Sequence, residues 1–106
     1  MEHNNLNNFI KGWFIGNFNP SLLITNDFEI SVKRYKAGDS ELRHYHKVAT
    51  EYTIIIEGEV IMNSIKFKTN DIIILQPNES SDFICLTDVI TVVVKTPSIK
   101  NDKYND

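Results

Sequence analysis

Two histidines and one glutamate form the group in this sequence best suited to chemistry. His44 and His46 flank Tyr45, and Glu51 follows five residues later. In an extended segment residues i and i+2 point to the same side, so both imidazoles can reach one point. Two neutral imidazoles and one carboxylate suit a divalent first-row metal such as iron, manganese, nickel or zinc, and they leave positions open for substrate. A surface His-Xaa-His pair near a glutamate also arises by chance, so this pattern alone is weak.

The rarity of these residue types strengthens the metal hypothesis. The chain has 106 residues but only three His and four Gly. Two of the histidines and two of the glycines lie within residues 38–58. The chemistry of the protein is therefore expected in this window.

The spacing within this window resembles the first conserved motif of the cupin superfamily. The resemblance extends to every motif residue and every spacing: Gly38, five residues, His44 and His46 around one residue, four residues, Glu51, six residues and Gly58. It implies an all-β fold, a small jelly-roll-like double-stranded β-helix barrel. It also implies that His44, His46 and Glu51 bind the metal and perform any catalysis.

The second cupin motif is degraded in this chain. In the family it consists of a glycine, a proline, a second glycine and a histidine that supplies a fourth ligand. The matching positions here hold Asn70, Gln76, Asn78 and Ser81, with Pro77 one place from the expected proline. Asn tolerates the left-handed backbone conformation better than other non-glycine residues, so we expect the turn to be kept.

The fourth ligand is not kept, because Ser81 is a poor metal ligand and Asp82 would point to the opposite face of a regular strand. Two outcomes follow. Either the three remaining ligands hold the metal with waters, like the two-histidine, one-carboxylate site of non-haem iron oxygenases, or metal affinity has dropped and the pocket works without metal or not at all.

The residues around the motif have less specific interpretations. By alternation Thr53 shares the direction of Glu51 and is expected to line the cavity, whereas Tyr52 belongs to the outer layer. Lys47 is interpreted as a solvated lysine. Glu41 and Arg43 can contact an anionic or hydroxylated substrate at the barrel mouth or form an exposed ion pair.

Three further residues are interpreted as having structural roles. Lys95 is interpreted as a charge at the end of a strand, although an inward lysine there would be a functional candidate. Trp13, with two neighbouring phenylalanines, is expected to form a packing cluster or a dimer contact. Cys85 has no base nearby in the sequence and is interpreted as a small buried residue.

The elements that must position this group are strands. The chain has 15 Ile and 7 Val but only 2 Ala, which favours strands over helices. Alternating or continuous apolar runs, separated by polar turns, predict about eight short strands. The segment 36–43 is expected to be a loop, and 71–75 a strand buried on both faces. The predicted strands lie at residues 12–16, 28–32, 52–56, 60–62, 65–67, 71–75, 83–86 and 89–95.

Length and charge limit the organisation and the partners. A chain of this length forms one domain. We expect an N-terminal arm or strand packing on the barrel over residues 1–27, the cupin β-barrel over 28–97 and a flexible C-terminal tail over 98–106. The net charge of −3 and the scattered basic residues argue against nucleic-acid binding. A single cysteine, the lack of a signal pattern and the lack of a long apolar run favour a cytoplasmic protein without membrane contact. Strands that are apolar on both faces suggest a homodimer.

Three functions remain open at this point. The first is a metal-dependent enzyme acting on a small polar metabolite inside the barrel. The second is a metal-free sugar or nucleotide-sugar isomerase or epimerase, in which His44 or His46 moves a proton as general acid or base. The third is a non-catalytic protein that binds a small ligand, which the loss of the fourth ligand favours.

Overall fold

The protein is built almost entirely from short β-strands. The computed structural model describes residues 1–106, and its one helical segment, the 3₁₀ turn η1 (Leu6–Asn8), is too short to cross a membrane. The all-β prediction is therefore confirmed. In chain order the strands are β1 (Trp13–Ile15), β2 (Glu29–Tyr35), β3 (Ser40–Tyr45), β4 (Thr50–Glu57), β5 (Glu59–Met62), β6 (Ile65–Lys68), β7 (Ile72–Leu75), β8 (Ser81–Cys85), β9 (Val89–Thr96) and β10 (Tyr104–Asn105).

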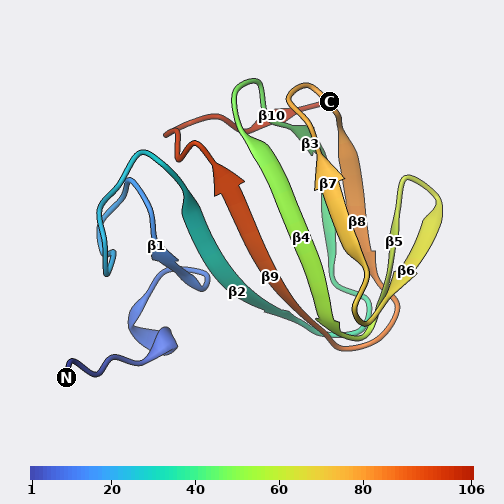
Figure 1. The fold of residues 1–106 in the computed structure, drawn as a ribbon. Helices are drawn as coiled ribbons and strands as arrows, with labels where there is room; N and C mark the ends of the chain where they lie inside the picture. The colour runs from blue at the N-terminus through green and yellow to red at the C-terminus, as the bar shows by residue number, and fades with distance from the viewer.

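The strands form two five-stranded sheets in which every pairing is antiparallel (Figure 1). One sheet has the order β1-β2-β9-β4-β7, and the other has the order β10-β3-β8-β5-β6. Most neighbours within a sheet are distant in the chain, because the chain passes from one sheet to the other several times. This is the arrangement of a jelly-roll-like barrel, and both sheets contribute to its interior.

Side-chain alternation builds an apolar region between the sheets. On β4 the side chains of Thr53 and Ile55 are buried while those of Tyr52 and Ile56 are exposed, as the period of two requires. We call the buried cluster the apolar region. Burial there raises the pKa of the Cys85 thiol to about 11, as expected for an inert structural cysteine. The apolar region consists of Ile55, Val60, Met62, Phe83, Cys85 and Val89.

Two asparagines keep the turns that glycines form in the cupin motif. Asn70 has φ of 77° and Asn78 has φ of 71°, both in the left-handed region. The prediction that asparagine preserves these turns is confirmed. Both turns flank β7, so they set the position of the strand beside β4.

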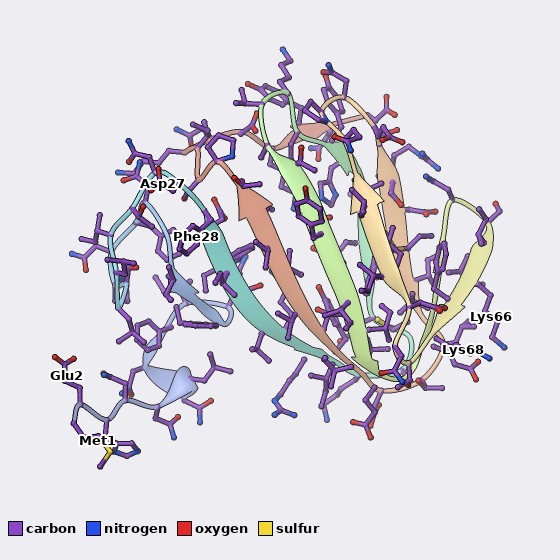
Figure 2. All side chains as sticks on the ribbon, in the orientation of Figure 1. Met1, Glu2, Asp27, Phe28, Lys66 and Lys68 are labelled. Atoms are coloured by element: carbon purple, nitrogen blue, oxygen red, sulfur yellow. The ribbon has the colours of Figure 1, made fainter.

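The N-terminal segment adds a strand to the first sheet. The predicted short strand around Trp13 is confirmed as β1, which pairs with β2. Beyond it, Met1 and Glu2 lie at the end of the arm, away from the sheets (Figure 2). On the opposite side of the molecule, Lys66 and Lys68 of β6 extend outward from the second sheet (Figure 2).

The structure differs from the sequence analysis in three places. The expected loop over 36–43 contains the first half of β3, which pairs with β8. Strand β7 is not buried on both faces in the single chain, because Ile72 and Ile74 are exposed. The expected flexible tail over 98–106 instead packs on the barrel: Ser98 and Asp102 are buried, and β10 pairs with β3.

Candidate functional site

A bulge in β3 aims the first histidine into the barrel. Glu41 pairs with Phe83 and His44 pairs with Ser81, so β3 has one more residue than β8 between these two pairs. Residues three apart in a regular strand would face opposite sides, but the extra residue lets Glu41 and His44 both face inward. Both side chains line the same interior cavity.

The structure brings together the three residues that the sequence analysis singled out. His46 follows the end of β3 and is 5% exposed, and Glu51 enters from the start of β4. Glu51 Oε1 lies 3.6 Å from His46 Nε2, and the His44 and His46 rings meet edge to face with centroids 5.5 Å apart. One ligand atom from each of the three residues lies within 4.8 Å of the other two.

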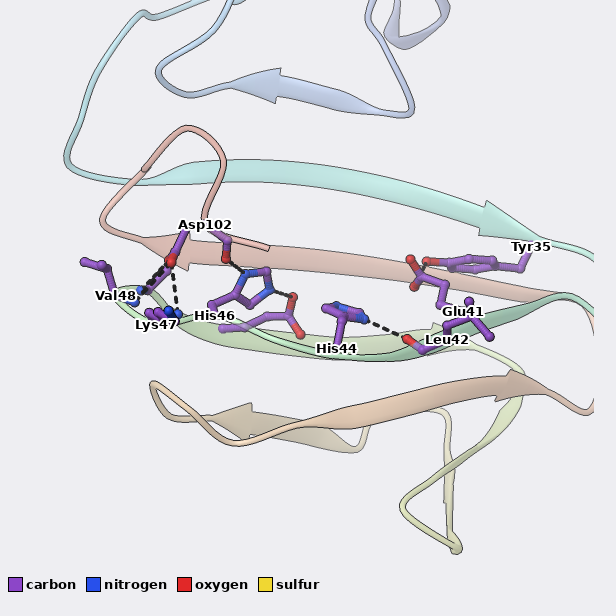
Figure 3. Close-up of polar contacts among 10 residues, drawn as sticks. Tyr35, Glu41, Leu42, His44, His46, Lys47, Val48 and Asp102 are labelled. Carbon is purple, nitrogen blue, oxygen red and sulfur yellow. Dashed lines mark hydrogen bonds and ion pairs between the residues drawn. The ribbon is translucent and has the colours of Figure 1, made fainter. Parts of the chain in front are cut away.

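Backbone carbonyls fix which nitrogen of each histidine is free (Figure 3). His46 Nδ1 lies 2.5 Å from the carbonyl oxygen of Asp102, and His44 Nδ1 lies 2.9 Å from that of Leu42. A carbonyl can only accept, so each Nδ1 carries the proton. In the neutral rings the lone pairs therefore lie on Nε2, and such carbonyl partners are common behind metal-binding histidines.

The free nitrogen of His46 and the charge of Glu51 fit a cation. His46 Nε2 is buried and has no hydrogen-bond partner in the protein. Burial raises the pKa of the Glu51 carboxyl, but the His46 imidazole and the Lys95 ammonium outweigh it and hold the pKa below its ordinary value. A deprotonated carboxylate beside two imidazole lone pairs is a donor set that suits a divalent first-row metal.

Ser81 occupies the place opposite His44. It is 3% exposed and lines the cavity, while its hydroxyl donates to the carbonyl oxygen of Asp82 at 2.7 Å. The protein therefore offers three strong ligands and a hydroxyl where the cupin motif has a fourth ligand.

Asp102 is a residue of this site that the sequence analysis missed. Its carboxylate accepts hydrogen bonds from the backbone amides of Lys47, Val48 and Ala49, at distances from 2.9 to 3.3 Å. Burial raises its pKa, but these three amides outweigh burial and hold the pKa below the ordinary 3.8. The C-terminal segment thus clamps the loop between His46 and β4 while its carbonyl orients His46. An isolated aspartate in a polar tail gives no sequence signal for this role.

The structure also gives positions for the other residues that the sequence analysis considered. Thr53 lines the cavity and Tyr52 is on the outer face, as predicted. The interpretation of Lys95 as a strand-end charge is wrong, because its side chain lines the cavity. Arg43 is exposed and donates to Ser80 Oγ at 3.3 Å.

The cavity between the sheets holds about 220 Å³ and mixes polar and apolar walls. Its polar wall includes His44, Glu51, Ser81, Lys33 and Lys95, and Lys95 of β9 pairs directly with Glu51 of β4. Such a volume suits a small polar metabolite better than a drug-sized ligand, for which pockets of about 300–1,000 Å³ are usual.

The comparison with known proteins supports the fold. No protein-family model and no curated protein matches the chain. Among solved structures, a conserved protein with a double-stranded β-helix domain from Klebsiella pneumoniae is 24% identical with a TM-score of 0.69, over 76% of this chain and 71% of that one. A cupin-superfamily sugar phosphate isomerase from Silicibacter pomeroyi is 22% identical with a TM-score of 0.61, over 66% and 50%. A DMSP lyase from Ruegeria pomeroyi is 14% identical with a TM-score of 0.70, over 83% and 47%.

The chain thus has the double-stranded β-helix fold of cupin proteins, as the motif resemblance implied. It spans about half the length of the isomerase and of the lyase.

Proposed function

We propose that a cupin-type barrel with this site binds one divalent first-row metal ion through His44, His46 and Glu51 and acts on a small polar metabolite. The observation that carries the proposal is the buried, unpartnered Nε2 of His46 within a three-residue ligand cluster. A buried acceptor without a partner is unfavourable unless something binds it. When bound, the metal would supply Lewis acidity to a substrate oxygen.

The residues of the chain provide the surroundings for this chemistry. The Leu42 and Asp102 carbonyls hold the two imidazoles in one tautomer, and Glu51 remains ionised. The cavity walls around Thr53 and Ser81 confine a small molecule beside the cluster. The solved structures compared above include a sugar phosphate isomerase and a DMSP lyase, so both reaction types are candidates.

Metal analysis of the protein purified without a histidine tag tests the proposal. We expect one equivalent of iron, manganese, nickel or zinc, lost in His46→Ala and retained in His3→Ala. His3 is the matched control, because it is an exposed histidine of the N-terminal arm. A folded wild-type protein that takes up none of the four metals would contradict the proposal.

A second function is favoured by the lack of a fourth ligand. Ser81 donates its hydroxyl to a carbonyl, and His46 Nε2 faces the Glu51 carboxylate at 3.6 Å. An imidazole so placed can move a proton without a metal, as a sugar or nucleotide-sugar isomerase or epimerase requires. If the protein is metal-free, a rise in melting temperature with sugar phosphates or nucleotide sugars would support this function. Binding without turnover would instead indicate a non-catalytic protein that holds the ligand.

A homodimer is the assembly that we propose for this protein. The outer face of β4 and β7 exposes large apolar side chains on neighbouring strands, which a second copy would cover. Light scattering should give twice the chain mass for the wild type and the mass of one chain for Ile74→Glu. Lys66→Glu, on the outer face of the other sheet, should remain dimeric. The exposed side chains are Tyr52, Ile56, Ile72 and Ile74.

A further inference from the structure

Two lysines point into the barrel from neighbouring strands of the first sheet. Lys33 of β2 pairs with Thr91 of β9, and Lys95 lies four residues further along β9 on the same face. Their ammonium nitrogens lie 5.1 and 5.0 Å from the centroid of the Trp13 ring. Both lysines, Thr91 and Trp13 line the same cavity as His44 and Glu51.

Neither lysine has a carboxylate partner. The only lysine within 4.0 Å of a carboxylate oxygen in this protein is Lys66, which pairs with Glu59 on the surface. Burial lowers the pKa of the Lys33 ammonium and outweighs the Glu41 carboxylate, which raises it, while the nearby Lys95 lowers it further. Holding two ammonium groups near one aromatic ring without a carboxylate in direct contact is unfavourable, although the ring itself offsets part of the cost.

Glu51 lies directly across from Lys95 on the neighbouring strand, but the cavity glutamates make their direct polar contacts with other groups. Glu41 accepts a hydrogen bond from Tyr35 Oη at 3.0 Å, and Glu51 faces His46. In a chain with a net charge of −3, the cavity is lined by four lysines and three carboxylates. The interior is thus more cationic than the molecule as a whole, which attracts anions to it.

A buried hydroxyl lies beside the lysines without a partner. Thr91 is 1% exposed, lines the cavity, and its Oγ1 has no hydrogen-bond partner. Its direct neighbours across the strands are Lys33 of β2 and Ile55 of β4. A hydroxyl donor across from Lys33, in a cavity that Lys95 also lines, adds to a set of donors that an anionic oxygen satisfies.

We propose that Lys33, Lys95 and Thr91 form an anion subsite that binds the carboxylate or phosphate of the substrate. The inference rests on the proposed function for its second part, namely that the other end of the same molecule reaches His44, His46 and Glu51. Trp13, which lies near both ammonium groups, forms part of the wall of this subsite. The substrate class is therefore a small anionic metabolite, carboxylated or phosphorylated, with a further oxygen group at the metal-ligand cluster.

Fluorescence of Trp13 tests the subsite directly, because it is the only tryptophan of the chain. The full-length protein is titrated separately with inorganic phosphate and with malonate, at constant ionic strength in chloride. A saturable change with at least one anion is expected, and the anion that binds tells whether the subsite takes phosphate or carboxylate. No saturable change with either anion overturns the inference.

Substitutions of the two lysines test whether they bind the anion. Lys33→Met and Lys95→Met should each raise the Kd of the bound anion roughly tenfold or more, because a charged donor is lost. Lys33→Arg and Lys95→Arg should retain binding, and they keep the test decisive if a methionine variant fails to fold. Lys66→Met is the matched surface control and should bind like the wild type. An unchanged Kd in both methionine variants, or an equal loss in Lys66→Met, overturns the inference.

Metal content and anion titration together distinguish a failure of the anion subsite from a failure of the metal-dependent function. Titration is repeated on protein stripped with a chelator and on protein with its metal content measured. A protein that holds metal but binds neither anion overturns the subsite alone. A protein that never holds metal but binds the anion through Lys33 and Lys95 supports the subsite and contradicts only the metal-dependent function.

Discussion

Two regions of the barrel interior share strands β4 and β9 but differ in how their polar groups are compensated. The apolar region around Ile55 and Val60 is fully buried and contains no polar side-chain atom without a partner. The polar region around His46 contains unpartnered buried atoms and unpaired lysines. We define the polar region by the residues Lys33, His44, His46, Glu51, Thr91 and Lys95.

The difference shows that the two regions contribute unequally to the stability of the fold. Burial of apolar area is the main source of stability, and it is concentrated in the apolar region. The polar region adds little stability, because His46 Nε2 and Thr91 Oγ1 are desolvated without compensation. Such uncompensated groups are retained where a ligand satisfies them. The predictions below separate the two regions.

The largest effect is expected from a cavity in the apolar region. Ile55 is 0% exposed, so Ile55→Ala should lower the free energy of unfolding by about 2–5 kcal/mol. Ile65→Ala is the matched control, because Ile65 is 57% exposed and should lose well under half as much. Urea denaturation followed by circular dichroism measures both. Equal losses would mean that the apolar region is not the main source of stability.

Asp102→Asn should have the next largest effect. Its carboxylate accepts three backbone amides, and hydrogen bonds to a charged group contribute about 1–3 kcal/mol to stability. We therefore expect the variant to be less stable by about 1–3 kcal/mol at pH 7, as measured by denaturation. The clamp also orients His46, so metal affinity should fall with it.

The pH dependence of the stability difference between wild type and Asp102→Asn gives a second test. The folded-state pKa of Asp102 lies below its ordinary 3.8, so its contribution is fully present above that value. It is lost as the pH falls through the folded-state pKa, because the protonated carboxyl accepts less strongly. The stability gap between wild type and Asp102→Asn should therefore narrow below pH 3.8. A constant gap would show that the charge of Asp102 is not what holds the loop.

Much of the metal-ligand cluster could be predicted from the sequence because its parts are close in the chain. His44, His46 and Glu51 lie within eight residues, and strand alternation is a local rule. The asparagine turns at Asn70 and Asn78 were predictable for the same reason, since φ depends on the residue itself.

The rest depends on contacts between distant segments. Asp102 is 56 residues from His46, and no local pattern shows that a polar tail folds back on a loop. The bulge in β3 depends on the pairing of this strand with β8, which is distant in the chain. Local residue patterns do not show that pairing, and they predict a loop over 36–43 instead. The inward direction of Lys95 depends on which face of β9 meets the interior, and a strand apolar on both faces leaves that choice open.

Ser81→His tests the polar region, and its expected effect on free energy is smaller than those of the substitutions above. Ser81 lies opposite His44 and lines the cavity, so a histidine there would add the ligand that the second motif lacks. Metal affinity should rise roughly tenfold, equivalent to about 1.4 kcal/mol. Calorimetric metal titration measures the gain, and Ile84→His on the outer face of β8 is the control. A gain in the control, or none in Ser81→His, would mean that position 81 does not face the bound metal.

The smallest effect on stability, and the most diagnostic, is expected from Thr91→Val. The two side chains have nearly the same shape, and the substitution removes a buried hydroxyl that has no partner. The variant should be as stable as the wild type or more stable, by up to about 1 kcal/mol, because an uncompensated polar group is lost. Thermal denaturation in chloride buffer measures this, and the Trp13 titration should show weaker anion binding in the same variant. A loss of stability comparable to that of Ile55→Ala would place Thr91 in the apolar region, and the division between the two regions would then be wrong.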